Sequence, residues 1–153
     1  MEHILQLKNA GIERGKQLVL TGVNLSMSRS EFVYLIGRTG SGKSSLLKTL
    51  WGEIPLVQGA GSIAGFDLAA LSSRKVTSLR RKIGIVFQEF HLFKEWTIQE
   101  NLRFVLEATG WKDRVKMDTR IHEVLTEVEL AQYLDKEAGQ LSGGEQQRLG
   151  IAR

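Results

Sequence analysis

The sequence predicts an α/β fold in which a parallel sheet is covered by helices. Residues 32–36 and 83–87 form two nearly continuous apolar runs, which is typical of strands buried on both faces. Helical periodicities occur between and after these runs, and a glycine-rich loop joins the first run to a helix. The length of 153 residues fits one ordinary domain with a sizeable core.

The other elements of the first half follow in chain order. Alternating apolar residues at 4–7 predict a strand, and a helix over 44–50 follows the glycine-rich loop. Residues 51–71 hold the only proline and several glycines, so we expect turns around a short strand near 62–66. A short helix before the run at 83–87 carries a basic cluster that we interpret as a solvated face: Arg74, Lys75, Arg80, Arg81 and Lys82.

Two helical stripes dominate the second half of the chain. One consists of Ile98, Leu102, Val105 and Leu106, and the other of Ile121, Val124, Leu125 and Val128. This spacing places the members of each stripe on one helix face. We interpret both stripes as core and assign them no chemistry.

Composition and charge exclude several classes of protein. The formal net charge is +4, but basic and acidic residues are interleaved, so nucleic-acid binding is not indicated. Cysteine is absent, which excludes disulfide frameworks and thiolate metal sites and fits a reducing compartment. The sequence shows neither a signal peptide nor a membrane-spanning stretch. We therefore expect a cytoplasmic protein that reaches a membrane only through a partner.

The glycine-rich loop has the spacing of a phosphate-binding P-loop: Gly37, Arg38, Thr39, Gly40, Ser41, Gly42, Lys43 and Ser44. Its glycines allow successive backbone N–H groups to turn toward an anion, and the following helix directs its positive dipole end at the same place. Lys43 is expected to reach the β and γ phosphates, and Ser44 to bind Mg²⁺. Ser45 is expected to add a phosphate contact. The loop therefore predicts binding of a nucleoside triphosphate.

A second motif stands near the C-terminus and reads Leu141, Ser142, Gly143, Gly144, Glu145, Gln146, Gln147 and Arg148. Ser142 and Glu145 have the spacing of a capping box, so the segment could simply begin a helix. A cap does not need two glycines inside it. Gly143 and Gly144 make sense if this backbone must approach another group closely, such as a phosphate.

Together these two motifs resemble the P-loop and signature of ATP-binding-cassette (ABC) ATPases. Gln88 agrees, because it follows the run at 83–87, where the family has its Q-loop glutamine. The resemblance covers essentially the whole chain. It implies a P-loop NTPase fold of the ABC type, with an N-terminal β-subdomain and a parallel-sheet core over about residues 1–92. A helical signature subdomain is implied over about residues 93–153.

The resemblance also implies a mechanism and cofactors. Two copies would dimerise head to tail, each holding ATP and Mg²⁺ between its own P-loop and the partner's Ser142, Gly143, Gly144 and Glu145. Gln88 would sense the γ-phosphate and the metal, together with Ser44. ABC ATPases of this kind act with an integral membrane partner at the inner face of the cell membrane.

Finer detail in residues 79–92 and 141–153 resembles the FtsE-like cell-division branch of the family, whose members pair with an FtsX-like membrane protein. ATPases of lipoprotein-release and macrolide exporters share much of the same pattern, so both alternatives stay open. A third alternative, of another class, is a regulatory module that binds a nucleotide without hydrolysing it.

The sequence departs from the family in two places. Family members usually stack an aromatic residue on adenine, but no aromatic residue precedes Phe32, and Glu13 stands at that place. The chain also ends inside the signature helix, before the Walker B strand, the catalytic glutamate and the switch histidine. We therefore expect a fragment that does not hydrolyse ATP by itself, and an exposed, aggregation-prone edge beside the P-loop strand.

Overall fold

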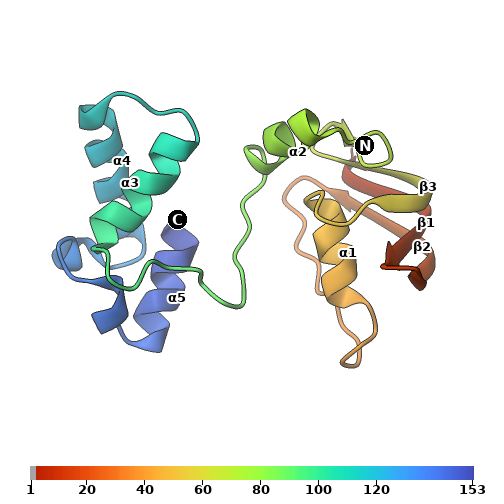
Figure 1. The fold of residues 1–153 in the computed structure, drawn as a ribbon, viewed down its shortest axis with the longest axis horizontal. Helices are drawn as coiled ribbons and strands as arrows, with labels where there is room; N and C mark the ends of the chain where they lie inside the picture. Colours follow the sequence, from red (N-terminus) through yellow and green to blue (C-terminus); the bar gives the residue numbers. More distant parts are fainter. Residues whose placement is uncertain (1–2) are drawn as a thin grey trace. The chain divides into compact units, whose positions relative to one another are not determined.

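The computed structural model describes residues 3–153, which form two compact units (Figure 1). The first unit ends at Gly84, and the second comprises Ile85–Arg153. The second unit thus begins within the segment that the sequence resemblance assigns to the nucleotide-binding core. Among the described residues, no helix has the length and apolar character needed to cross a membrane.

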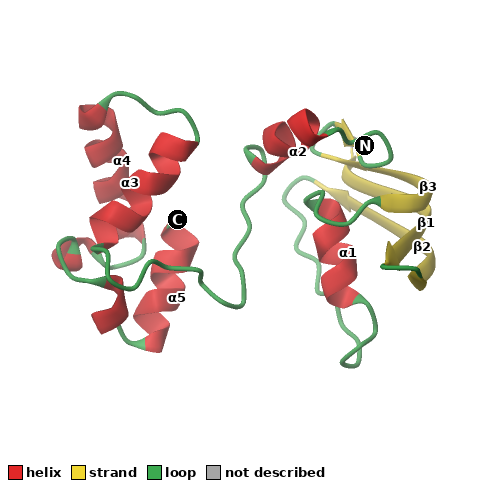
Figure 2. Ribbon diagram, viewed as in Figure 1, coloured by secondary structure: helices red, strands yellow, loops and turns green. Residues whose placement is uncertain are grey.

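The first unit is built on an antiparallel sheet with the strand order β2-β1-β3-β4 (Figure 2). Its strands are β1 (His3–Arg14), β2 (Gln17–Ser28), β3 (Leu56–Ile63) and β4 (Phe66–Asp67). The strand predicted at 4–7 is confirmed within β1. The strand predicted near 62–66 is wrong in its bounds, because Ala64 and Gly65 have positive φ values of 48° and 82° and turn the chain between β3 and β4.

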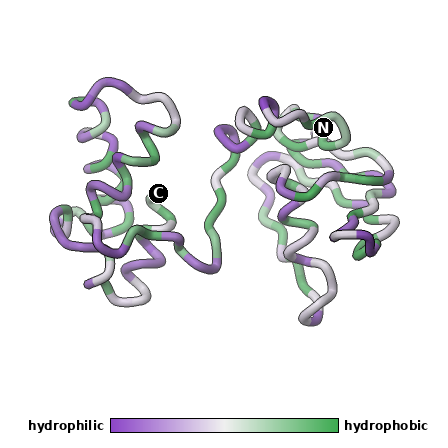
Figure 3. The backbone as a smooth tube through the Cα atoms, viewed as in Figure 1, coloured by the Kyte–Doolittle hydropathy of each residue, from purple (hydrophilic) through white to green (hydrophobic). Residues whose placement is uncertain are grey.

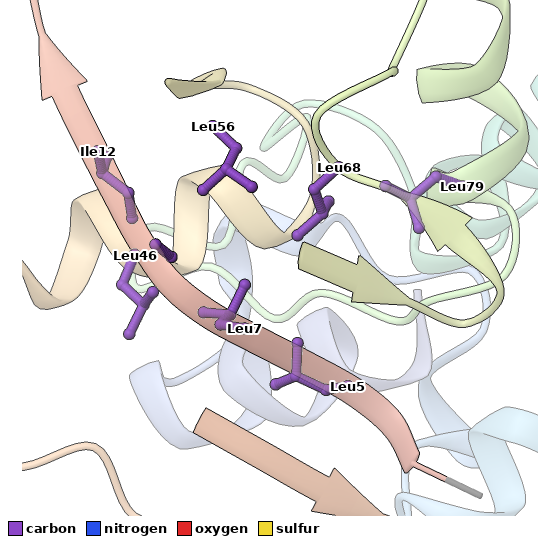
Figure 4. Packing of buried hydrophobic residues seen from close by; sticks show 8 residues of the cluster. Leu5, Leu7, Ile12, Leu46, Leu56, Leu68 and Leu79 are labelled. Atoms are coloured by element: carbon purple, nitrogen blue, oxygen red, sulfur yellow. The ribbon is translucent and has the colours of Figure 1, made fainter. Parts of the chain in front are cut away.

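One face of this sheet packs against α1 (Lys43–Leu50). Leu46 of α1 belongs to the same buried cluster as Leu7 and Ile12 of β1, and Figure 4 shows these side chains close together. Helix α2 (Ser73–Arg80) adds Leu79, which is fully buried. The predicted helices at 44–50 and around the basic cluster are therefore confirmed, and α1 is fixed to the sheet by apolar burial.

A β-bulge in β1 is stabilised by polar contacts and by one glycine. Asn9 has a φ of 47°, and its N–H donates to Oδ1 of Asn24 at 3.0 Å. Gly59 of β3 lies so close to the bulge that a Cβ on it would approach the Asn9 and Lys8 carbonyl oxygens to 2.3 Å. The close approach of two backbones thus requires glycine at position 59.

The predictions of strands at 32–36 and 83–87 are wrong, because the structure of residues 3–153 has no strand at either place. Both segments have an extended backbone that pairs with no other strand described here. Phe32, Tyr34 and Ile36 are 80%, 78% and 88% exposed. Figure 3 colours much of the extended chain between α2 and α3 as hydrophobic. A strand exists only where a neighbour completes its hydrogen bonds, and in the described part of the chain neither segment has one.

The second unit is helical and comprises α3 (Ile98–Ala108), α4 (Arg114–Glu127) and α5 (Gly143–Ala152), with 3₁₀ turns at Ala131–Tyr133 and Ala138–Gln140. The core role predicted for the two stripes is confirmed for every member except Val105, which is half-buried and lies outside the buried cluster of this unit. Ile98, Ile121 and Leu125 are at most 1% exposed and belong to one cluster, which also includes Leu149 of α5. This cluster positions the N-terminus of α5.

Candidate functional site

The glycine-rich loop lies directly before α1 and makes the backbone turns that the sequence predicts. Gly40 and Gly42 have φ values of 83° and 90°, in the left-handed region that favours glycine. The N–H of Ser41, between them, donates to the carbonyl of Arg38 at 3.1 Å. No side chain caps the N-terminus of α1, so its first N–H groups remain available to an anion.

Lys43 folds back over this loop. Its Nζ donates to the carbonyl oxygens of Gly37 at 2.7 Å and of Arg38 at 2.8 Å. An ammonium group has three donors, and phosphate oxygens accept hydrogen bonds more strongly than carbonyls because they are charged. The loop therefore holds a positive charge that a phosphate can recruit.

The serines at the start of α1 differ in exposure. Ser44 is exposed and can offer its hydroxyl to Mg²⁺, a hard cation that prefers oxygen ligands. Ser45 is only 6% exposed, and its carbonyl accepts a hydrogen bond from the Thr49 hydroxyl at 3.1 Å. Residues 3–153 contain no group of three or more His, Cys, Asp or Glu side chains able to hold a metal. Mg²⁺ at Ser44 would therefore need further oxygen ligands other than carboxylates, such as an amide oxygen, phosphate oxygens and water.

The loop is also shaped by close packing. A Cβ on Gly37 would lie 2.7 Å from the Ser41 hydroxyl oxygen, and a Cβ on Gly42 would lie 2.8 Å from Leu20 of β2. Side chains at these two positions would press on the loop or on the β1–β2 hairpin. Arg38, Thr39 and the other loop residues before Gly42 are exposed and accessible to a ligand.

The second motif forms the N-terminus of α5, and the predicted capping box is present. Glu145 N–H donates to the Ser142 hydroxyl at 3.4 Å, while the Ser142 N–H and hydroxyl donate to Oε2 of Glu145, both at 2.7 Å. The hydrogen bonds from the Ser142 hydroxyl and then from its backbone N–H lower the pKa of Glu145. Glu145 therefore stays ionised and holds the helix start in place.

The two glycines of this motif have no role in packing within the described chain. A Cβ built on Gly143 or on Gly144 meets no atom within 4 Å, and neither residue has a positive φ. Gly59 is the opposite case, because its Cβ would collide with backbone. Glycine in a helix costs about 1 kcal/mol relative to alanine, so its use here points to a group approaching from outside.

Gln88 is exposed in the extended segment of the second unit. The segment after it is anchored, because the Phe90 ring contacts α5 where a Cβ on Gly150 would lie 3.5 Å away. The rings of Phe87 and His91 meet edge to face at 5.2 Å. These residues help to line a cavity of about 240 Å³.

The structure thus gathers the predicted residues into separate groups. Residues 37–45 form one loop and helix start in the first unit. Gln88 and residues 142–145 lie in the second unit, where the capping box brings the signature residues together.

Asn101 is an organising residue that the sequence analysis did not identify. Its side chain is fully buried, accepts from the Phe93 N–H at 2.9 Å, and donates to the carbonyls of Phe93 at 2.9 Å and Thr97 at 3.0 Å. These bonds fix the loop before α3. The sequence did contain a signal for this role, because Asn101 shares a helix with Ile98 and Leu102 of the apolar stripe, and a buried asparagine needs polar partners.

The loop fixed by Asn101 displays an aromatic patch, which we define as Phe93, Trp96 and Phe104. Phe93 stacks on Trp96 with centroids 4.3 Å apart, and both rings meet Phe104 edge to face. The three side chains are 37%, 38% and 42% exposed, respectively. Exposed aromatic clusters of this kind mark interaction surfaces.

Comparison with known proteins identifies the family. The family model described as "ABC transporter" matches residues 20–153. The cell division ATP-binding protein FtsE of Streptococcus pneumoniae is 39% identical over 134 residues, which cover 88% of this chain and 58% of that protein. FtsE of Bacillus subtilis is 40% identical over the same shares. The methionine import ATP-binding protein MetN 2 of Salmonella choleraesuis is 40% identical over 86% of this chain and 38% of that protein.

Solved structures share the fold. A dimeric ATP-binding cassette in a post-hydrolysis state, bound to ADP and Pi, has a TM-score of 0.82 and 33% identity over 97% of this chain and 67% of that one. The cbiO1 protein of Clostridium perfringens, part of the transporter complex cbiONQ, has a TM-score of 0.89 over 99% of this chain and 61% of that one, at 24% identity. The chain spans a little over half the length of the FtsE proteins it matches. With its P-loop and signature helix in the family's fold, the chain belongs to the ABC transporter family.

Proposed function

We propose that this chain is the nucleotide-binding portion of an ABC ATPase that binds ATP with Mg²⁺ and, in the whole protein, hydrolyses it. The observation that carries the proposal is the combination of a P-loop built for an anion with a helix start whose two glycines are free of internal contacts. The P-loop residues in contact with the nucleotide are Gly37, Arg38, Thr39, Gly40, Ser41, Gly42, Lys43, Ser44 and Ser45.

Mg²⁺ supplies charge neutralisation at the phosphates when it is bound. Ser44 is the residue at the P-loop that would hold it, with Gln88 as the second protein ligand. Lys43 places a positive charge at the β and γ phosphates. Hydrolysis also needs a carboxylate that orients the attacking water, and none of the site residues identified in this chain supplies one.

We infer that the complete site forms between two copies arranged head to tail. In this arrangement Ser142, Gly143, Gly144 and Glu145 of one copy cover the phosphates held by the P-loop of the other. The open space at both glycines supports this, because a phosphate can approach the α5 backbone there. The dimeric relative with ADP and Pi gives further support.

A complementation experiment in the whole protein tests both claims. Lys43→Ala removes the phosphate contact, and Gly144→Phe fills the open space at the signature, so each variant alone should lose ATP turnover. Mixed dimers should recover activity if the sites are shared, because one of the two sites then combines an intact P-loop with an intact signature. No recovery on mixing would exclude the head-to-tail arrangement. Unchanged turnover in the Lys43→Ala protein would exclude the P-loop assignment, and Lys112→Ala, at an exposed position, is the control.

The biological process in which the protein acts is a separate and more specific proposal. We propose a role in cell division with an FtsX-like membrane partner, at the inner face of the cell membrane, supported by the similarity to FtsE proteins. The methionine import proteins are equally similar in identity, which favours as a second candidate the ATPase subunit of a transporter that moves a solute. Depletion of the protein should produce a division defect under the first proposal and a solute-transport defect with normal division under the second.

We further propose that the aromatic patch is the surface that contacts the membrane partner. Its rings are held in place by Asn101 but remain more than a third exposed, which is typical of anchor residues at interfaces. Trp96→Ala should release the protein from the membrane fraction without loss of nucleotide binding. Trp111→Ala, at another exposed tryptophan, is the matched control. Equal membrane retention of the two variants would exclude the patch as the contact.

A further inference from the structure

The basic residues of the chain are distributed unevenly between its two units. The first unit has twelve basic and five acidic residues, so its formal charge is +7. The second unit has nine basic and twelve acidic residues, so its formal charge is −3. Such an asymmetry between two parts of a chain indicates that the basic part meets an anionic surface.

Five of the twelve basic residues of the first unit form the basic cluster at 74–82: Arg74, Lys75, Arg80, Arg81 and Lys82. No acidic residue occurs between positions 68 and 88. All five residues of the cluster are exposed, and none of them forms an ion pair with another residue among 3–153. The cluster is therefore the densest source of positive charge in the first unit.

Helix α2 directs the cluster away from the sheet. Its apolar face packs inward, because Leu79 is fully buried and Val76 lies so close to Gly52 that a Cβ on the glycine would approach it to 3.1 Å. Arg81, the C-cap, keeps a helical backbone with a φ of −75°. Arg74 precedes it by seven residues, or nearly two turns, so both arginines lie on the face opposite Leu79. They are about 10 Å apart along the helix axis.

One member of the cluster is engaged by the first unit itself. The Arg80 Nε donates to the Trp51 carbonyl at 3.2 Å. The pKa of Glu53 is lowered chiefly by its hydrogen bond from Lys48, and in smaller part by Arg80. The other four basic side chains form no hydrogen bond within the described part of the chain, so they are available to an external anion.

A lipid surface with anionic headgroups fits this cluster better than a nucleic acid does. The negative potential of such a surface attracts Lys and Arg side chains and requires no particular geometry from them. Proteins that bind single-stranded nucleic acid use aromatic side chains on which the bases stack, and residues 72–82 include no aromatic residue. The proposed membrane partner would also bring the protein to an anionic lipid surface.

We propose that the basic cluster of α2 docks the first unit on an anionic lipid surface through charge attraction alone. The apolar face of α2 is occupied by the core, so the helix does not insert between acyl chains. A polybasic surface of this kind binds reversibly, and stable retention requires a second contact, which the proposed membrane partner supplies. The inference goes beyond the proposed function, because it adds a direct lipid contact to the contact through a partner.

The test is flotation of the purified whole protein with vesicles of phosphatidylcholine alone, or of phosphatidylcholine with about one third phosphatidylglycerol. The protein should float with the anionic vesicles only, and it should dissociate as the ionic strength rises from about 0.05 M to about 0.5 M. The Arg74→Gln/Arg81→Gln double variant should lower the partition coefficient about 25-fold, because each basic residue near the surface contributes a factor of about five. Arg74→Lys/Arg81→Lys keeps the charge and should bind like the wild-type protein.

Two further double variants complete the test. Lys75→Gln/Lys82→Gln should show a loss similar to that of the arginine pair, so the conclusion does not depend on the folding of one variant. Lys8→Gln/Arg29→Gln removes the same charge from exposed positions of the first unit outside the cluster, and this matched control should lower the partition coefficient less than about twofold. Binding of a fluorescent ATP analogue should be equal in all variants.

Each contrary result has a definite meaning. An equal loss in the matched control would overturn the inference, because the net charge and not the cluster would then carry binding. Equal flotation with neutral vesicles, or full binding to anionic vesicles by both cluster variants, would overturn it as well. Loss of binding to a labelled RNA oligonucleotide in these variants, with vesicle binding unchanged, would assign the cluster to nucleic acid instead. A wild-type protein that floats with anionic vesicles but binds no ATP would overturn only the proposed function.

Discussion

Replacement of Asn101 by alanine tests how the helical unit holds its aromatic patch. The Asn101 side chain makes three hydrogen bonds of 3.0 Å or shorter, two of them to Phe93 and one to Thr97. A weaker fourth contact reaches the Trp96 carbonyl at 3.4 Å. Alanine removes all of these bonds and leaves the backbone groups of the loop without their partner.

The expected loss of stability follows from the bond count. Each hydrogen bond contributes about 1 kcal/mol net, so three bonds give about 3 kcal/mol. Alanine recovers a few tenths of a kcal/mol through its better helix propensity, which leaves about 2 to 3 kcal/mol. Asn101→Asp should cost at least as much, because it keeps the acceptor for the Phe93 N–H but sets a buried negative charge against carbonyl oxygens.

Urea unfolding followed by far-ultraviolet circular dichroism measures this loss, and tryptophan fluorescence reports the state of Trp96 in the patch. Glu107→Ala, at an exposed position on the same helix, is the control and should change the free energy of unfolding by less than about 0.5 kcal/mol. If Asn101→Ala is as stable as this control, the bonds of Asn101 do not hold the loop. The reasoning about the patch would then be wrong.

Three further predictions concern glycines and ionised caps. Gly143→Ala should leave thermal stability unchanged or slightly raised while it reduces nucleotide-dependent dimerisation, measured by light scattering, because its Cβ meets nothing inside the described chain. Gly59→Ala should lower the unfolding temperature strongly, since its Cβ would lie 2.3 Å from the carbonyl oxygen of Asn9, and a mild effect would contradict the bulge geometry. The pKa values of Glu100 and Glu145 are lowered by hydrogen bonds from their helix caps. The stability that the two ionised carboxylates give the folded state is therefore complete above the unfolded pKa of about 4.3, and it is lost as pH falls through the lower folded pKa values. Thermal melts from pH 6 to pH 3 would show this loss. The Glu100→Gln and Glu145→Gln proteins should lack this part of the pH dependence.

Local signals in the sequence were sufficient for the helices and caps. The P-loop helix, the core stripes apart from Val105, and the capping box of α5 depend on residues within a few positions of one another, and they appear in the structure as predicted. The β2 strand was not predicted, because its burial is only partial and its partner β1 determines its register. Whether a segment forms a strand depends on its pairing with another segment, and a single sequence gives little information about that pairing.

The site shows the same division between local and long-range information. Local spacing and the family resemblance together marked Lys43, Ser44 and the signature glycines as candidates. Glu13 stands where family members usually have the aromatic residue that stacks on adenine, but its pairing with Leu18 in the hairpin is known only from the structure. Asn101 was missed for a related reason, since its importance depends on the loop at Phe93 folding back over α3.

The two apolar segments at 32–36 and 83–87 connect the fold to the site. The first leads directly into the P-loop, and the second leads into Gln88, so both are attached to the residues on which the proposed chemistry depends. Their side chains are apolar and largely exposed in the described chain, which costs free energy unless another surface covers them. A strand that paired with the first segment would bury its side chains and would also fix the chain that leads into the P-loop. Completion of the sheet and assembly of the nucleotide site would then be one event, and we expect nucleotide affinity to rise together with protection of these backbone amides from hydrogen exchange.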